Sequence, residues 1–181
     1  MGIRRITLGI YNTYDPLKLR EPHRRSIARA GALCAAFEIN LAVFGFPFKI
    51  ELSTPMEMAD FVAKSTTIGQ EGKYLLDIAA EGKVQIFDFV SRGFPPQLGI
   101  PIATTCKPEI SKRTTPGEVM EIIRYKKGVL LLLGLGPRGL SDELKKICTY
   151  HLDITGRGYS LETCTAMGAI AGYLGALRDR F

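Results

Sequence analysis

The sequence predicts a single α/β domain, with a mostly parallel sheet covered by helices on both faces. Three observations lead to this prediction. The chain has 181 residues, about the size of one domain. Strand-like and helix-like segments alternate along it, and several strands are apolar on both faces, which is typical of buried parallel strands. No linker or internal repeat interrupts the pattern, so the expected domain covers residues 1–181.

The expected strands are short runs rich in β-branched and apolar residues. They cover residues 3–10, 41–46, 83–89, 100–104, 129–133 and 150–154. Because ligands of such sheets bind at the carboxyl ends of the strands, we expect a site at that edge. Three loops rich in glycine or hydroxyl residues follow strands there: 104–108, 134–139 and 155–160.

The expected helices show apolar residues at helical spacing behind recognisable start signals. They cover residues 24–37, 55–63, 67–80, 115–125, 140–147 and 160–177. Pro22 precedes the first helix, and Thr115 begins the fourth. The alternation of these helices with the strands is what favours a parallel sheet.

Composition excludes several classes of protein. With 46% hydrophobic and 23% charged residues and a mean hydropathy of +0.08, the chain is not intrinsically disordered. The longest uncharged run near either end, residues 163–177, has 15 residues rich in Gly and Ala, and it suits a buried helix better than a membrane span. No export signal precedes the first strand. We therefore expect a cytoplasmic protein with no membrane partner.

The net charge is +6, and most of it lies near the start of the chain. Between residues 1 and 31, seven basic residues are set against Asp15 and Glu21. The basic residues are Arg4, Arg5, Lys18, Arg20, Arg24, Arg25 and Arg29. This cluster predicts an anionic partner, and nucleic acid ranks ahead of a membrane because no amphipathic basic helix accompanies it. A solvated basic surface without a partner is the alternative.

The four cysteines, Cys34, Cys106, Cys148 and Cys164, are far apart and form no C-x-x-C pair. Cys34 and Cys164 lie in apolar helical patterns, and we expect them to be buried thiols of a cytosolic protein. Cys148 and His151 would make half of a zinc site, but the sequence offers no second half, so we expect no metal.

Residues 134–139 match the G-x-G-x-x-G pattern, follow a predicted strand and begin a helix. Asp153 lies 19 residues after Gly134, close to the spacing of a ribose-binding acid. This indicates a dinucleotide site, yet only 42 residues follow Gly139, fewer than a Rossmann half requires. A purely structural glycine turn is a further interpretation.

The segment from Val129 to Leu174 resembles the C-terminal half of the SPOUT superfamily of RNA methyltransferases. In that superfamily an apolar strand leads to G-x-E-x-x-G-L, a short helix, a strand near an I-P-M-like loop, and S-L-N at the start of a helix. The matching positions are Gly134, Gly139 and Leu140 in the first loop, 154–156 in the middle loop and 160–162 at S-L-N. The segment from Glu21 to Arg29 is similar to the family's first motif, with Arg29 at the place of its arginine.

The resemblance implies an S-adenosylmethionine-dependent RNA methyltransferase that acts on tRNA or rRNA. It also implies that the cofactor binds in a C-terminal deep trefoil knot of the SPOUT type, within about residues 98–177. The expected cofactor-binding residues are glycines that allow close approach of the backbone, together with apolar and hydroxyl residues around an adenine slot. They are Thr104, Thr105, Leu133, Gly134, Leu135, Gly136, Gly139, Ile154, Gly156, Tyr159, Ser160 and Leu161.

The resemblance makes Arg29 and Glu162 the candidate catalytic residues. Arg29 would stabilise the developing alkoxide of a ribose 2′-hydroxyl, and Glu162 would accept a proton from a base nitrogen. A second interpretation of Glu162 is an acid favoured by the helix dipole at the start of a helix. We expect Arg20, Arg24 and Arg25 to bind RNA phosphates.

Two departures from the family pattern leave another function open. Gly136 replaces the usual acid of the first loop, and Glu162 replaces the usual asparagine. A protein without those groups could bind RNA or cofactor and transfer no methyl group. The alternative prediction is therefore a catalytically inactive RNA- or cofactor-binding module, and a dinucleotide-binding protein ranks below it.

The resemblance also implies a homodimer formed through the helices at 26–37 and 160–177, which are both rich in Ala and Gly. Gly168 and Gly172 are four residues apart on one helical face and would admit a partner helix. Packing of these small residues against the chain's own sheet is the alternative.

Overall fold

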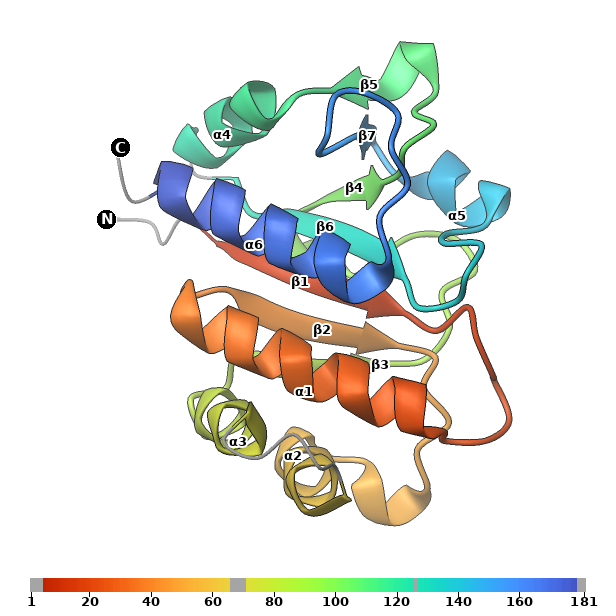
Figure 1. Cartoon of the computed structure of the whole chain (residues 1–181), viewed down its shortest axis with the longest axis vertical. Coiled ribbons are helices and arrows are strands. Elements are labelled where there is room, and N and C mark those ends of the chain that lie inside the picture. Colours follow the sequence, from red (N-terminus) through yellow and green to blue (C-terminus); the bar gives the residue numbers. More distant parts are fainter. Residues whose placement is uncertain (1–4, 66–70, 126, 179–181) are drawn as a thin grey trace.

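Within residues 5–65, 71–125 and 127–178, which the computed structural model describes, seven strands form one sheet, and every neighbouring pair is parallel (Figure 1). The strands are β1 (Ile6–Tyr11), β2 (Asn40–Phe44), β3 (Val84–Phe87), β4 (Ile100–Thr104), β5 (Arg113–Thr114), β6 (Val129–Gly134) and β7 (Tyr150–Leu152). Their order across the sheet is β3-β2-β1-β6-β4-β7-β5. The strand β6 therefore lies between β1 and β4.

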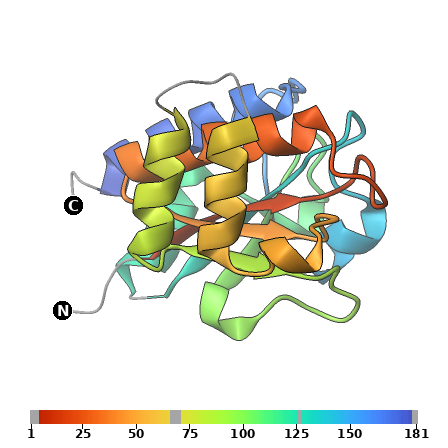
Figure 2. The same ribbon diagram turned by 90° about the horizontal axis from the view of Figure 1, so that it is seen from below.

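The helices are α1 (Glu21–Ala36), α2 (Pro55–Ser65), α3 (Glu71–Ala80), α4 (Pro116–Arg124), α5 (Asp142–Ile147) and α6 (Thr163–Arg178). Short 3-10 turns cover Ile50–Leu52, Pro96–Leu98 and Ile110–Lys112. The helices α1 and α6 lie side by side across the sheet (Figure 1), and α2 and α3 pack together beside α1 (Figure 2). No helix in the described part of the chain is both long enough and apolar enough to cross a membrane.

The alternation of strands and helices expected from the sequence is confirmed, and β4 has the predicted bounds. Residues 3–4 of the first predicted strand and 67–70 of the third predicted helix lie outside the described residues. The strand β5 was not predicted, because Arg113 and Thr114 carry no apolar or alternating run. It pairs with β7 at the edge of the sheet, so tertiary pairing decides its conformation.

Helices lie on both faces of the sheet, as predicted, but they are unevenly distributed. The helices α1, α2, α3, α4 and α6 contribute to the apolar core on one face, whereas α5 and residues 88–99 contribute to the core on the other. Alternate leucines of β6 point to opposite faces, with Leu131 in the first core and Leu132 in the second. Both are 0% exposed. A wholly apolar strand of this kind needs a covering layer on each side, which explains the position of β6 in the middle of the sheet.

The carboxyl ends of β1, β6, β4 and β7 meet at one edge of the sheet, since these strands are adjacent or nearly so and all parallel. After β1 the chain builds β2 and β3 on one side, and after β3 it crosses to β4 on the other. The edge beside β1, β6 and β4 is thus where the direction of the strand order changes. Sheets of this class bind ligands at such a place.

Two buried polar side chains, Asn12 and His23, hold the connection between β1 and α1. The Nδ1 atom of His23 accepts a hydrogen bond from the backbone N–H of Arg20 (2.9 Å), so Nε2 carries the proton and donates to Oδ1 of Asn12 (3.0 Å). The amide nitrogen of Asn12 donates to the carbonyl oxygens of Asp15 and Gly45 (both 2.9 Å). Burial lowers the pKa of His23 and keeps the ring neutral in this tautomer.

We expect this network to make the free energy of unfolding fall as the pH drops below the ordinary histidine pKa of about 6.5. The folded pKa of His23 is lowered, so the unfolded chain binds the proton more strongly and acid favours unfolding. The slope due to one such group is at most about 1.4 kcal/mol per pH unit. The variant His23→Gln keeps an acceptor for Arg20 and a donor for Asn12 but does not titrate. Urea unfolding from pH 7 to 5 should show a shallower pH dependence for this variant, and equal slopes for both proteins would contradict the assignment.

Candidate functional site

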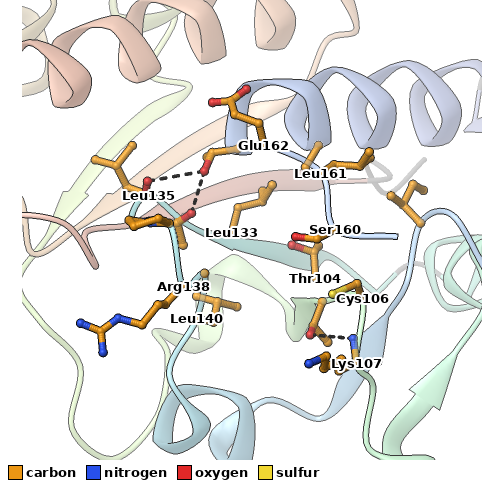
Figure 3. Close-up of a pocket in the computed structure, with 18 of the residues that line it drawn as sticks. Thr104, Cys106, Lys107, Leu133, Leu135, Arg138, Leu140, Ser160, Leu161 and Glu162 are labelled. Carbon is orange, nitrogen blue, oxygen red and sulfur yellow. Dashed lines mark hydrogen bonds between the residues drawn. The ribbon is translucent and has the colours of Figure 1, made fainter. Parts of the chain in front are cut away.

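A cavity of about 600 Å³ opens at the carboxyl edge of the sheet, between the connections that follow β4, β6 and β7 and the beginning of α6 (Figure 3). Eleven of the twelve residues expected from the sequence to bind a cofactor line it. They are Thr104, Thr105, Leu133, Gly134, Leu135, Gly136, Gly139, Ile154, Tyr159, Ser160 and Leu161. The twelfth, Gly156, is not among the lining residues and turns the β7–α6 connection with a φ of +63°. The fold thus brings together three loops that are far apart in the sequence.

The cavity also has walls that sequence patterns did not identify. Tyr14 comes from the β1–α1 connection, Pro22 from the first turn of α1, and Ala166 and Ile170 from α6. These residues reach the site because β1 lies beside β6 and because α6 returns over the sheet. The polar loop after the first strand was visible in the sequence, but the neighbour of that strand was not.

The glycines of the β6–α5 loop bring segments of the chain's own backbone together. A Cβ atom on Gly134 would overlap the carbonyl group of Gly139, and one on Gly136 would overlap the carbonyl oxygen of Thr13. Neither glycine has a positive φ, so the missing Cβ allows close contact within the chain, and the binding of a cofactor by these two residues stays a prediction. Gly139 differs, since it has a φ of +67° and a Cβ there would meet no atom within 4 Å.

Hydrogen bonds tie the β6–α5 loop to β1 and to α6. The backbone N–H of Leu135 donates to the carbonyl oxygen of Tyr11 (2.9 Å). The hydroxyl of Thr163, the first residue of α6, donates to the carbonyl oxygen of Gly134 (3.0 Å). The start of α6 is therefore attached to the end of β6, and both form the wall of the cavity.

The carboxylate of Asp153 organises the β7–α6 connection. One of its oxygens, Oδ1, accepts from the N–H (3.0 Å) and the hydroxyl (2.7 Å) of Thr155, and Oδ2 accepts from the N–H of Gly158 (2.7 Å). Burial by itself would raise the pKa of Asp153, but these hydrogen bonds outweigh it and hold the pKa below its usual range. Since both oxygens are used within the connection, the arrangement argues against a ribose-binding role for this acid.

Glu162 caps α6. Its Oε2 accepts hydrogen bonds from the backbone N–H groups of Cys164 (3.0 Å) and Thr165 (3.2 Å), and the helix therefore begins at Thr163, three residues later than predicted. Burial would raise the pKa of Glu162, but these N–H groups and the nearby Arg29 guanidinium hold it below its usual range. A carboxylate stabilised in this way is a weak proton acceptor.

Arg29 lies next to Glu162 but outside the cavity. It lines a second, apolar groove of about 770 Å³ between α1, α3 and α6, together with Ala32, Tyr74, Cys164 and Gly168 among others. Its Nη1 donates to Sγ of Cys164 (3.3 Å). The fold brings both candidate catalytic residues to the start of α6, one facing each depression. Cys164 is partly exposed there, which corrects the expectation of a buried thiol, whereas Cys34 is fully buried as expected.

The small residues of α1 and α6 divide between two environments. A Cβ on Gly31 would lie 2.8 Å from Cβ of Leu75 in α3, and a Cβ on Gly175 would lie 2.9 Å from the ring of Phe37. These glycines thus serve packing within the chain. A Cβ on Gly168 would meet no atom within 4 Å, so this part of α6 faces the open groove.

The basic residues near the start of the chain do not form one surface, contrary to expectation. Arg4 lies outside the described residues. Arg5 precedes β1 and therefore lies at the amino edge of the sheet, about 20 Å from the carboxyl edge for a strand of this length. The remaining basic residues lie on the β1–α1 connection and on α1.

The three arginines expected to bind RNA lie around the beginning of α1, near the carboxyl edge. Two of them are paired with a carboxylate: Arg20 with Asp15 at 3.0 Å and Arg25 with Glu21 at 3.3 Å. Arg24 is partly buried, and within the described residues its Nε has no hydrogen-bond partner. This surface therefore carries less uncompensated charge than the sequence suggested.

Two solved structures show the same fold. A protein whose structure is described as giving insights into the 2-OH methylation of C/U34 on tRNA has a TM-score of 0.59 and 19% identity, over 100% of this chain and 94% of that one. The TrmH/SpoU tRNA modifying enzyme of A. aeolicus has a TM-score of 0.56 and 16% identity, over 98% of this chain and 77% of that one. The fold is that of the SPOUT/TrmH-family methyltransferases, as the sequence resemblance implied.

Sequence comparison gives a narrower assignment. An uncharacterized protein of Methanocaldococcus jannaschii is 42% identical over 168 residues, which cover 93% of this chain and 92% of that protein. The family described as "Protein of unknown function (DUF531)" matches residues 6–175. The chain, with its SPOUT-like sheet and its cavity at the carboxyl edge, belongs to this DUF531 family.

Proposed function

We propose that the protein is an S-adenosylmethionine-dependent RNA methyltransferase that acts on tRNA or rRNA. The observation that carries the proposal is the cavity at the carboxyl edge, which is built from the three loops that the sequence placed at the carboxyl ends of the strands. The fold is the one found in the tRNA-modifying enzyme of A. aeolicus, whose structure matches 98% of this chain.

The residues present fit S-adenosylmethionine. Leu133, Leu135 and Leu161 give the cavity apolar walls suited to an adenine ring, and Gly139 leaves open space where any other residue would place a Cβ. When bound, the cofactor supplies an electrophilic methyl group on a sulfonium. The role of the chain is to hold the acceptor in line and to exclude water, which accounts for most of the acceleration of such reactions.

The proposal includes the trefoil knot of SPOUT proteins within about residues 98–177. After β7, which lies beyond β4, the chain passes back along the carboxyl edge, and α6 then packs against α1 and β6. Thr163 is hydrogen-bonded to the β6–α5 loop on this path. The β7–α6 connection therefore passes the loop after β4. A trefoil knot requires a later segment of the chain to pass through such a loop.

Arg29 would assist the loss of the acceptor's proton to solvent. Oε2 of Glu162 already accepts two backbone N–H groups, which makes this carboxylate a poor base and favours the ribose alternative over a base nitrogen. Arg29 remains charged and would stabilise a developing alkoxide. Its guanidinium lies beside Glu162 at the start of α6, close to the cavity wall.

A second candidate is a module that binds RNA or cofactor and does not transfer methyl groups. One observation favours it specifically: a side chain at Gly136 would overlap the carbonyl oxygen of Thr13, so the usual acid of the first loop could not be placed there without a backbone shift. A dinucleotide is disfavoured, since Asp142 and Glu143 put two acids in the first turn of α5, where a pyrophosphate would have to bind.

We also propose that the protein is a homodimer and is located in the cytoplasm. The groove between α1, α3 and α6 is apolar, and its wall includes Gly168, where a partner helix would find space. Because Arg29 lines this groove and Glu162 lines the cavity, a partner seated there would lie next to the site. The four free thiols are typical of a reducing compartment.

Binding of S-adenosylhomocysteine tests the cofactor. Calorimetry should show about one site per chain and no binding of NADH. Ala166→Leu, which fills the cavity from α6, should weaken binding at least about tenfold, whereas Ala176→Leu on the exposed side of α6 should not change it. Binding of NADH without binding of S-adenosylhomocysteine would return the glycine loop to the dinucleotide interpretation.

Transfer of radiolabelled methyl groups to total RNA from cells lacking the protein tests the activity. Arg29→Ala should lower the rate about 100-fold and leave the affinity for S-adenosylhomocysteine within about twofold. Lys64→Ala, on the surface of α2, is the matched control and should keep full activity. Full activity of Arg29→Ala would place the site elsewhere. A wild-type protein that binds S-adenosylhomocysteine but methylates no RNA would favour the inactive module.

Light scattering tests the dimer. The particle should have about twice the chain mass of 19.9 kDa, and Ala32→Glu should convert it to a monomer by placing a charge in the groove. Ala80→Glu, at the exposed end of α3, should leave the mass unchanged. A wild-type particle of 19.9 kDa at micromolar concentration would contradict the dimer.

A further inference from the structure

Tyr159 presents an exposed aromatic ring on a rigid segment of the cavity wall. It is 68% exposed, and none of the ring–ring contacts among the described residues involves it. The N–H groups of Arg157 and Tyr159 both donate to the hydroxyl of Thr155 (3.2 and 3.3 Å). The N–H of Gly158 donates to the carboxylate of Asp153. A rigid aromatic side chain without a covering partner is typical of binding surfaces, because little conformational entropy is lost when a ligand covers it.

The exposure of Tyr159 also separates it from the residues that would hold a cofactor. Leu133 is 3% exposed and lies in the inner part of the cavity, whereas Tyr159 is 68% exposed and stands at its mouth. The sequence placed Tyr159 among the cofactor-binding residues. Its exposed ring is better placed to meet a larger molecule that approaches from solvent.

Three exposed cations accompany Tyr159. Lys107 and Arg138 line the same cavity (Figure 3), and Arg157 lies two residues before Tyr159 in the same connection. No carboxylate of the described residues forms an ion pair with any of the three. In this they differ from Arg20 and Arg25 near the start of α1, which are both paired. The cavity mouth therefore combines an exposed aromatic ring with uncompensated positive charge.

We propose that Tyr159 stacks on an unpaired nucleobase of the RNA, and that Lys107, Arg138 and Arg157 bind phosphates near that nucleotide. The proposal rests on the RNA-directed function above and narrows its substrate to a single-stranded segment or loop. A base within a duplex is already stacked on its neighbours, whereas an unpaired base offers a free face to an aromatic side chain. Cations beside the ring neutralise the backbone of the same strand.

The test is direct binding of a fluorescent single-stranded RNA of mixed sequence, and of the same RNA paired with its complement, measured by anisotropy. The wild-type protein should bind the single strand more tightly. Tyr159→Ala should weaken that binding about tenfold and change duplex binding less than about twofold, while Tyr159→Phe should keep wild-type affinity. Tyr125→Ala is the matched control, since Tyr125 is 77% exposed at the end of α4 and does not line the cavity.

Two further measurements separate this proposal from its alternatives. The affinity for S-adenosylhomocysteine should be unchanged in Tyr159→Ala, and a loss of affinity would return Tyr159 to the cofactor site and overturn the proposal. Arg138→Gln should lower the slope of log affinity against log salt for the single strand by about 0.7, and Lys64→Gln should not change it.

Equal loss of single-strand and duplex binding in Tyr159→Ala would overturn the proposal, as would a loss in Tyr159→Phe as large as in Tyr159→Ala. A wild-type protein that binds S-adenosylhomocysteine and methylates RNA, but shows no preference for the single strand, would overturn this proposal and leave the proposed function standing. Absence of both cofactor binding and methylation would remove the function itself.

Discussion

The site depends on one constraint, the position of β6 between β1 and β4. A wholly apolar strand must be covered on both faces, and the centre of a parallel sheet provides this. Once β6 is there, the loop that follows it lies between the connections after β1 and β4. Thr163 then attaches α6 to the end of β6, and this contact places the start of the helix in the cavity wall. The site is thus a consequence of how the core is packed.

The cavity at the carboxyl edge and the groove between α1, α3 and α6 both adjoin the start of α6. The proposed dimer interface therefore lies next to the proposed site of methyl transfer. Glu162 lines the cavity and caps the helix, while Cys164, two residues later, lies in the groove against Arg29. A partner that filled the groove would constrain the Arg29 side chain, and the Arg29 charge acts on the Glu162 carboxylate. The same helix turn would therefore respond to both a partner and a bound ligand.

Much of the fold and of the site could be predicted from the sequence, because the deciding signals are local. The apolar run of β6, the glycines after it and the capped helices each follow from short patterns. Residues that depend on which strands are neighbours could not be predicted in this way: Tyr14 reaches the cavity only because β1 lies beside β6. The prediction of a single basic cluster was also wrong, since Arg5 and Arg20 are close in sequence but lie at opposite edges of the sheet. The capping role of Glu162 was one of two interpretations, and its hydrogen bonds now account for the helix start.

The proposed function requires that the loops after β4, β6 and β7 form one binding site for S-adenosylmethionine. Hydrogen exchange of the full chain, measured with and without S-adenosylhomocysteine, tests it most directly, because it reports each loop separately. We expect slower exchange in residues 104–107, 133–140 and 153–162 together, with little change in α2 and α3. Protection confined to the groove between α1, α3 and α6, or to one of the three loops, would contradict it.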